Sequence, residues 1–161
     1  MTGQITIQHA DVNSGTAVIL PASTATYTWG SLTNTTPIPG KWDIAESDVG
    51  GFENPKIIVR GTVDVGDPQT NWITHSLLMD FAQVQFDGTS AKAIKLTIAS
   101  GADGTTNEYL KGRPSAGYSI GGTYLDYIYV VITGFTITFD SNVVDERKWD
   151  YSITFNETKT T

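Results

Sequence analysis

The side chains that could do acid–base or metal chemistry are few and scattered. The two histidines, His9 and His75, are far apart in the sequence, and the chain has no cysteine to complete a metal site. The run GADGTTNE brings Asp103, Asn107 and Glu108 together, but it lacks the D-x-[DN]-x-[DN]-G spacing of a calcium loop. We therefore predict surface or packing histidines, a turn at GADGTTNE and no metal site.

Motifs for nucleophilic catalysis and phosphate binding are also missing. The glycine pairs at Gly50 and Gly121 are not followed by Lys-Ser/Thr and a helix, as a P-loop requires. No serine lies in a G-x-S-x-G elbow, and the acidic residues form no recognisable catalytic pair. The sequence predicts a protein that is not an enzyme, with no catalytic residues and no cofactor.

Aromatic residues could instead bind a ligand by stacking. The tryptophans Trp29, Trp42, Trp72 and Trp149, with seven tyrosines, could line a sugar-binding face of a β-sandwich module. Trp149 is in phase with the apolar residues around it, which favours core packing. Trp42 is the one aromatic residue that we interpret as a surface or interface anchor.

Composition limits the class of protein. A chain of 161 residues with 39% hydrophobic residues is long enough for one domain with its own core. Frequent Thr, Gly, Ile, Val and Tyr favour strands over helices. The net charge of −7 argues against a protein that grips nucleic acid tightly. No signal peptide and no membrane span are expected from the sequence.

The C-terminal residues carry the clearest pattern. In residues 149–156 large apolar side chains alternate with polar ones, and residues 134–139 have the same period of two. These runs predict a β-hairpin in which each strand has one buried face. From Tyr127 to Ile132 both faces are apolar, so we expect cover from the core on one side and from a partner subunit on the other. Tyr127, Tyr129 and Val131 are the candidates for that contact.

Weaker patterns predict further elements. Short strands are expected over residues 3–9, 16–20, 24–29 and 92–98, and a longer one over residues 56–65. In that longer strand the polar side chains Lys56, Arg60, Thr62 and Asp64 share one face. A helix is expected after residue 70, with an apolar stripe and a cap at Asn71 or Thr70. The stripe consists of Ile73, Leu77, Phe81 and Val84.

The segment 30–55 has no sustained period, and we interpret it as a long ordered loop. Loops beyond ~12–15 residues are uncommon in compact domains and often serve binding or assembly. Its apolar side chains need a surface to lie on, in this subunit or in a neighbour. These candidate contact residues are Ile38, Trp42, Ile44, Val49 and Phe52.

Together these elements predict one mainly β domain over residues 1–161. The expected architecture is an antiparallel β-sandwich or partial barrel with one flanking α-helix and the long loop 30–55.

Five runs then resemble the tail-tube family of tailed phages and contractile injection systems. They are IIVRGTVDV, WITHSLLMDFAQ, KAIKLTIA, YIYVVITGFTITFD and RKWDYSITFNET, which together span about residues 55–158. The resemblance implies a structural subunit of a tail tube or of a tube-like baseplate protein, located in the virion tail and assembled in the host cytoplasm.

The resemblance also implies how subunits would assemble. Usually six subunits join their inner sheets into a closed barrel, and the rings stack through a long loop, for which residues 30–55 are the candidate. DNA passes through a typically acidic lumen without specific binding, and neighbouring tail proteins are the other partners. Asp64, Thr136, Thr138 and Asp150 are candidates for the lumen or the outer wall.

Two other classes remain open from the residues alone. One is a carbohydrate-binding β-sandwich module, and the other is a capsid decoration or fibre protein.

Overall fold

The computed structural model describes nine stretches of the chain and shows a mainly antiparallel β protein with one α-helix, as the sequence predicts. The described stretches are residues 4–21, 23–28, 30–36, 46–52, 55–64, 70–87, 93–99, 127–139 and 148–158. The strands are β1 Gln4–Gln8, β2 Val18–Leu20, β3 Thr24–Thr28, β4 Ser31–Thr36, β5 Glu46–Phe52, β6 Lys56–Asp64, β7 Ile94–Ala99, β8 Ile128–Phe139 and β9 Lys148–Glu157. The α-helix α1 spans His75–Asp87, and a short 3-10 turn spans Asn13–Gly15.

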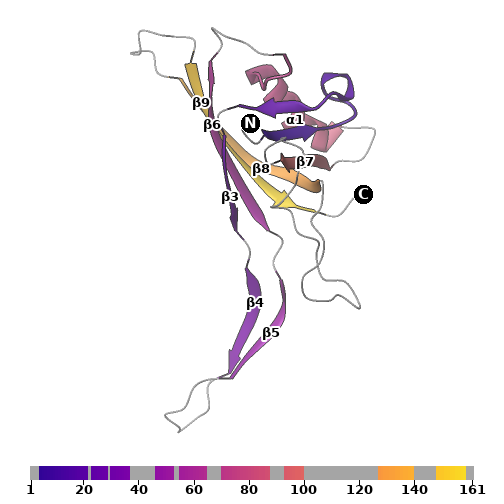
Figure 1. The fold of residues 1–161 in the computed structure, drawn as a ribbon. Helices are drawn as coiled ribbons and strands as arrows, with labels where there is room; N and C mark the ends of the chain where they lie inside the picture. Colours follow the sequence, from indigo (N-terminus) through magenta and orange to yellow (C-terminus); the bar gives the residue numbers. More distant parts are fainter. Residues whose placement is uncertain are drawn as a thin grey trace.

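Seven of these strands form one continuous sheet in the order β2-β1-β7-β8-β9-β6-β3 (Figure 1). Strand β8 joins its two halves, because β7 pairs with β8 only over Ile128–Val130 while β9 pairs with it from Val130 to Phe139. A β-bulge between Ile132 and Gly134 lies where the first partner ends. The sequence predicts a sandwich or partial barrel, and in the structure these seven strands belong to one sheet. A bulge of this kind bends its strand and increases the local twist.

The core lies on one face of this sheet, and α1 packs into it. The alternating residues of β9 from Trp149 to Phe155 are buried as predicted, and so are Ile57, Val59 and Val63 of β6. The helix contributes Leu78, Phe81 and Val84. Each large apolar side chain buried in this way stabilises the fold by about 1.5–3 kcal/mol.

The helix begins later than its apolar pattern suggests. The hydroxyl of Thr74 accepts a hydrogen bond from the backbone N–H of Leu77 at 3.2 Å, so Thr74 is the cap in place of Asn71 or Thr70. Ile73 is buried but precedes the helix, and Leu77 is only half-buried.

Residues 71–73 instead form backbone hydrogen bonds with strand β2. The Ile19 N–H donates to the Asn71 carbonyl at 2.7 Å, and the Ile73 N–H donates to the Ile19 carbonyl at 2.9 Å. This short parallel contact covers the outer edge of β2. Asn71 adopts φ 63°, a left-handed conformation that asparagine tolerates better than most residues.

The segment 30–55 is not the loop that the sequence suggests, because it contains strands β4 and β5. They pair antiparallel from Ser31↔Phe52 to Thr36↔Glu46 and form an arm that extends from the body (Figure 1). The arm continues the pairing of β3 with β6, which reaches Thr28↔Lys56. A two-stranded ribbon has no core behind it, so its sequence carries no apolar alternation from which to predict strands.

Candidate functional site

The four lumen or outer-wall candidates lie on one face of the sheet, opposite the core. Thr138 pairs with Asp150 across β8 and β9, Thr136 pairs with Ser152, and Asp64 pairs with Lys148 across β6 and β9. Register partners point to the same side of a sheet, so these side chains share the face that α1 does not cover. Thr136, Thr138 and Asp150 are exposed and Asp64 is half-buried. We call this surface of β8, β9, β6 and β3 the polar face.

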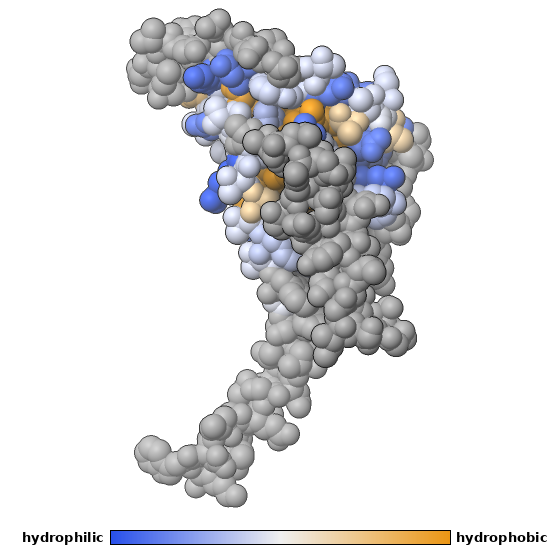
Figure 2. Space-filling view, in the orientation of Figure 1, coloured by the Kyte–Doolittle hydropathy of each residue, from blue (hydrophilic) through white to orange (hydrophobic). Residues whose placement is uncertain are grey.

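Hydroxyl groups dominate the polar face. The register places threonine or serine on all four strands. These residues are Thr24, Thr26, Thr28, Thr62, Thr136, Thr138, Ser152 and Thr154. The surface seen in Figure 2 is mainly white to blue over the described residues, with a few hydrophobic patches.

The charges on the polar face do not make it acidic. Lys56, Arg60 and Lys148 lie there together with Asp64 and Asp150, although the whole chain carries a net charge of −7. The charged residues described on this face are therefore three basic and two acidic ones, and they do not give it a net negative charge.

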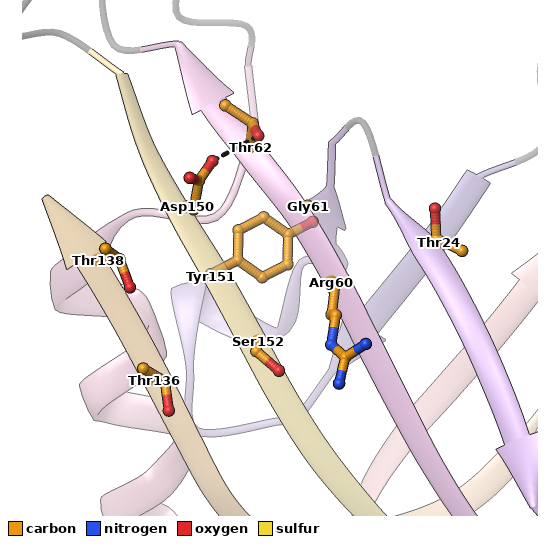
Figure 3. A pocket seen from close by; sticks show the side chains of 9 residues that line it. All are labelled: Thr24, Arg60, Gly61, Thr62, Thr136, Thr138, Asp150, Tyr151 and Ser152. Carbon is orange, nitrogen blue, oxygen red and sulfur yellow. Dashed lines mark hydrogen bonds between the residues drawn. The ribbon is translucent and has the colours of Figure 1, made fainter. Parts of the chain in front are cut away.

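A shallow hollow lies on the polar face around Arg60 (Figure 3). Thr62 Oγ1 donates a hydrogen bond to Asp150 Oδ1 at 2.7 Å at one end of it. Figure 3 shows the Arg60 side chain extending away from Asp150, level with Ser152. The full lining is Thr24, Arg60, Gly61, Thr62, Thr136, Thr138, Asp150, Tyr151 and Ser152.

Tyr151 fixes the sheet beneath this hollow. Its hydroxyl donates to the carbonyl of Pro21 at 2.8 Å, which ties β9 to the residue that follows β2. Burial raises the pKa of Tyr151, and a hydrogen bond with Ser23 partly offsets this shift. The ring lies over its register partner Gly61, where a Cβ atom would approach the Pro21 carbonyl oxygen to 2.7 Å. Glycine is therefore required at position 61 by close packing.

Within the described residues, the four strands beneath the polar face end in two edges that lack a full partner strand, which we call the open edges. Strand β3 pairs with β6 on one side, and no described strand pairs with its other side. On β8 the pairing with β7 ends at Val130, so the residues from Thr133 to Phe139 have β9 as their one described partner strand. The side-chain amide of Gln85 bonds both the N–H and the carbonyl of Ile132, two residues beyond the last pair between β7 and β8, Ile94↔Val130.

The residues from Tyr127 to Ile132 are only partly covered on their second side. Ile128, Val130 and Ile132 face the core, whereas Tyr127 is 40% exposed. Tyr129 and Val131 are half-buried. Among the described residues, the second side of this apolar run is therefore only partly covered.

Tyr127 and Tyr129 form a small cluster with Lys95. The two rings meet edge to face at 5.4 Å, and Lys95 Nζ lies 4.6 Å from the centre of the Tyr127 ring. A hydrogen bond to the Tyr127 hydroxyl raises the pKa of Tyr129.

The other inter-subunit candidates lie on or beyond the arm. Val49 and Phe52 are on β5, for which the structure describes the backbone. Ile38, Trp42 and Ile44 lie outside the described residues.

The remaining sequence candidates are dispersed. Trp149 is buried against Phe139 and Tyr151, as predicted, and Trp72 is half-buried beside β2, while Trp29 lies outside the described residues. His9 is buried, and its Nδ1 accepts a hydrogen bond from the Asp11 N–H at 3.1 Å.

No cluster of three His, Cys, Asp or Glu residues suited to a metal occurs within the described stretches. Among the helices described, none has the length and apolarity needed to cross a bilayer.

The neighbours of Arg60 could not be predicted from the sequence, because they depend on the register between strands. Arg60 was on the outward side of its predicted strand, but its neighbours Thr24 and Ser152 became apparent only with the pairing of β3, β6 and β9. Comparison of the chain with models of known families gives no match, and comparison with curated proteins gives no significant match.

Proposed function

We propose that this chain is a structural subunit of a phage-like tail tube or tube-like baseplate ring, as the resemblance of its sequence implies. The observation that carries the proposal concerns the part of the sheet formed by β8, β9, β6 and β3, which exposes a polar face. Within the described residues, no strand pairs with the outer side of β3 or, on the side away from β9, with the end of β8 from Thr133 to Phe139. Exposed strand edges are aggregation hazards that proteins normally cover, so two open edges on one sheet favour assembly.

The directions of the two edge strands suit repeated pairing. Each neighbouring pair among β8, β9, β6 and β3 is antiparallel, so β3 and β8 run in opposite directions. Strand β3 of one copy can therefore pair antiparallel with β8 of the next copy. Such a head-to-tail contact forms a ring when the rotation closes, and closure removes every free edge.

The side chains at the two edges are also compatible with this pairing. With the polar faces continuous, Thr24 and Thr26 of one copy would lie beside Thr136 and Thr138 of the next. On the opposite face, Phe139 is 62% exposed in the isolated subunit. A neighbouring strand would cover part of this apolar surface, which stabilises the contact.

The arm formed by β4 and β5 is the candidate for contacts between rings. It extends the ribbon of β3 and β6 away from the body of the domain (Figure 1). In this proposal Val49 and Phe52, with Ile38, Trp42 and Ile44 from the sequence between the two strands, contact the adjacent ring. Tyr127, Tyr129 and Val131 contact a neighbouring subunit.

In the assembled particle the polar face would line the lumen. Asp64, Thr136, Thr138 and Asp150 would then face passing DNA, and the protein would act in the virion tail without catalysis. Six copies are the expected number, because the family that the sequence resembles usually forms hexameric rings.

Cysteine cross-linking tests the edge pairing directly, since the natural chain contains no cysteine. Thr26→Cys on β3 would be combined in turn with Gly134→Cys, Thr136→Cys or Thr138→Cys on β8. Disulfides form when the Cα atoms are ~4.4–6.8 Å apart, so one register should give a ladder of covalent oligomers that ends at the ring size.

Each single-cysteine variant is the matched control and should stop at dimers. If all three double variants stop at dimers as well, while the wild-type chain forms rings, the edges are wrongly assigned.

A further inference from the structure

Arg60 is a cation among hydroxyl groups on the polar face. Its register partners are Thr24 on β3 and Ser152 on β9, and Ser152 pairs in turn with Thr136 on β8. Neighbouring strands lie ~4.8 Å apart, so the two flanking hydroxyls are within reach of one small group bound at the guanidinium. The row therefore offers hydrogen-bond donors from four adjacent strands, and three of them, β3, β6 and β9, supply Arg60 and its direct neighbours.

The carboxylate in the same hollow, Asp150, forms no ion pair with Arg60. Asp150 accepts the hydrogen bond from Thr62, and Figure 3 shows the guanidinium extending in the other direction. Among the described residues Arg60 forms no ion pair, and its side chain is exposed. The guanidinium is free to bind an anion from solution.

A second basic residue on the polar face favours an anion with more than one negative charge. Lys56 lies on the same face of β6, four residues before Arg60 and ~13 Å away along the strand. Lys148, at the start of β9, is paired in register with Asp64. Lys56 and Arg60 therefore make a short positive track along β6 that Lys148 does not share.

We propose that Thr24, Arg60 and Ser152 form a binding site for phosphate groups in the backbone of a nucleic-acid strand. The planar guanidinium fork can donate two hydrogen bonds to one phosphate, and the flanking hydroxyls can donate to its remaining oxygens. Lys56 contacts a second phosphate farther along the same strand.

The site requires only one copy of the chain, whereas its role in a lumen rests on the proposed function. Repeated around a ring, Arg60 places a belt of positive charge along the path of the strand. Such a belt retards passing DNA, in contrast to an acidic lumen through which DNA slides freely.

Fluorescence anisotropy with a labelled single-stranded oligonucleotide at low ionic strength tests the site on the unassembled chain. Arg60→Gln should weaken binding ~3–10-fold and lower the salt slope by about 1, because one phosphate contact is lost. Lys148→Gln removes the same charge from the same face and should change binding less than about 2-fold, since Asp64 already lies beside it.

A second variant tests the hydroxyl row without changing charge. Thr24→Val keeps the shape of the side chain and the strand preference, and should weaken binding ~2–3-fold by removing one donor. Inorganic phosphate should displace the oligonucleotide from the wild-type chain and from Lys148→Gln.

Any of three outcomes would contradict the proposed site. They are no oligonucleotide binding by the wild-type chain, equal losses of affinity in Arg60→Gln and Lys148→Gln, and an unchanged affinity in Thr24→Val. The two proposals fail separately. Rings without Arg60-dependent binding contradict the site alone, and Arg60-dependent binding by a chain that never forms rings contradicts the tube alone.

Discussion

The two halves of the seven-stranded sheet differ in whether other backbone covers their outer strand edges. On the half formed by β2, β1 and β7, the backbone of Asn71 and Ile73 bonds Ile19 and covers the outer edge of β2. On the half formed by β8, β9, β6 and β3, no described strand covers the outer edge of β3 or the last residues of β8. Within the described residues, backbone thus covers one edge and leaves two others without a partner strand, which is the pattern expected when those two bind other copies.

The largest effect should come from the joint formed by Gly61, Tyr151 and Pro21, where Tyr151 of β9 lies over Gly61 of β6 and bonds Pro21 at the end of β2. Gly61→Ala should lower the free energy of unfolding by about 1–3 kcal/mol, because its Cβ would overlap the Tyr151 hydroxyl and the Pro21 carbonyl. Denaturant unfolding measures this change.

Gly134→Ala is the matched control, made beside the open edge of β8. A Cβ at position 134 would meet no atom within 4 Å. The variant should therefore stay within about 0.5 kcal/mol of the wild-type chain. Equal costs at the two glycines would contradict the close packing that we assign to the joint.

The next effect concerns Gln85, whose side chain bonds Ile132 of β8. This residue lies between the part of β8 that pairs with β7 and the open edge of β8. Gln85→Met should cost about 1–2 kcal/mol, because the N–H and the carbonyl of Ile132 both lose their partner. Hydrogen exchange of the Ile132 amide should accelerate by more than that of the Val130 amide. An unchanged Ile132 rate would show that Gln85 does not protect this edge.

A smaller effect involves the Tyr151 hydroxyl. Tyr151→Phe should cost about 1 kcal/mol near neutral pH through loss of the bond to Pro21. The pKa of Tyr151 is raised on folding, so the neutral form stabilises the fold below the unfolded pKa of ~10, and this stabilisation is lost as the pH rises further.

The Phe variant should therefore lose less stability than the wild-type chain between about pH 9 and 11. Parallel losses of stability in the two proteins over that range would contradict the buried position of the hydroxyl.

The smallest effect is expected at the covered edge. Asn71→Ala should cost about 1 kcal/mol, because alanine lacks the short polar side chain that makes φ 63° tolerable for asparagine, whereas Asn71→Gly should cost less. Thermal unfolding of both variants measures the difference. Greater stability of the Ala variant would show that Asn71 is not held in the left-handed conformation.

The sequence predicts best where a strand or helix has a core on one side. Trp149 and Phe155 alternate with polar residues because α1 and the sheet bury one face, so the C-terminal hairpin could be predicted. Strands β4 and β5 could not be predicted, because their ribbon has no core to impose an apolar period. The helix cap was displaced to Thr74 because Asn71 bonds the edge of β2 instead.

The site was predictable only in part, for a related reason. Alternation alone placed Asp64, Thr136, Thr138 and Asp150 on the outward sides of their strands. The neighbours of Arg60 depend on register across β3, β6 and β9, and the pairing with β8 depends on the bulge at Ile132. Register is a tertiary property, and a shift of one residue would reverse every assignment to a face.

The most direct test of assembly through the open edges is negative-stain electron microscopy of the purified wild-type chain at high concentration. Raised ionic strength should promote assembly, because salt screens the repulsion between subunits of net charge −7. We expect rings or stacked tubes with an axial hole. Particles of single-subunit size at every concentration and salt level would contradict assembly through these edges.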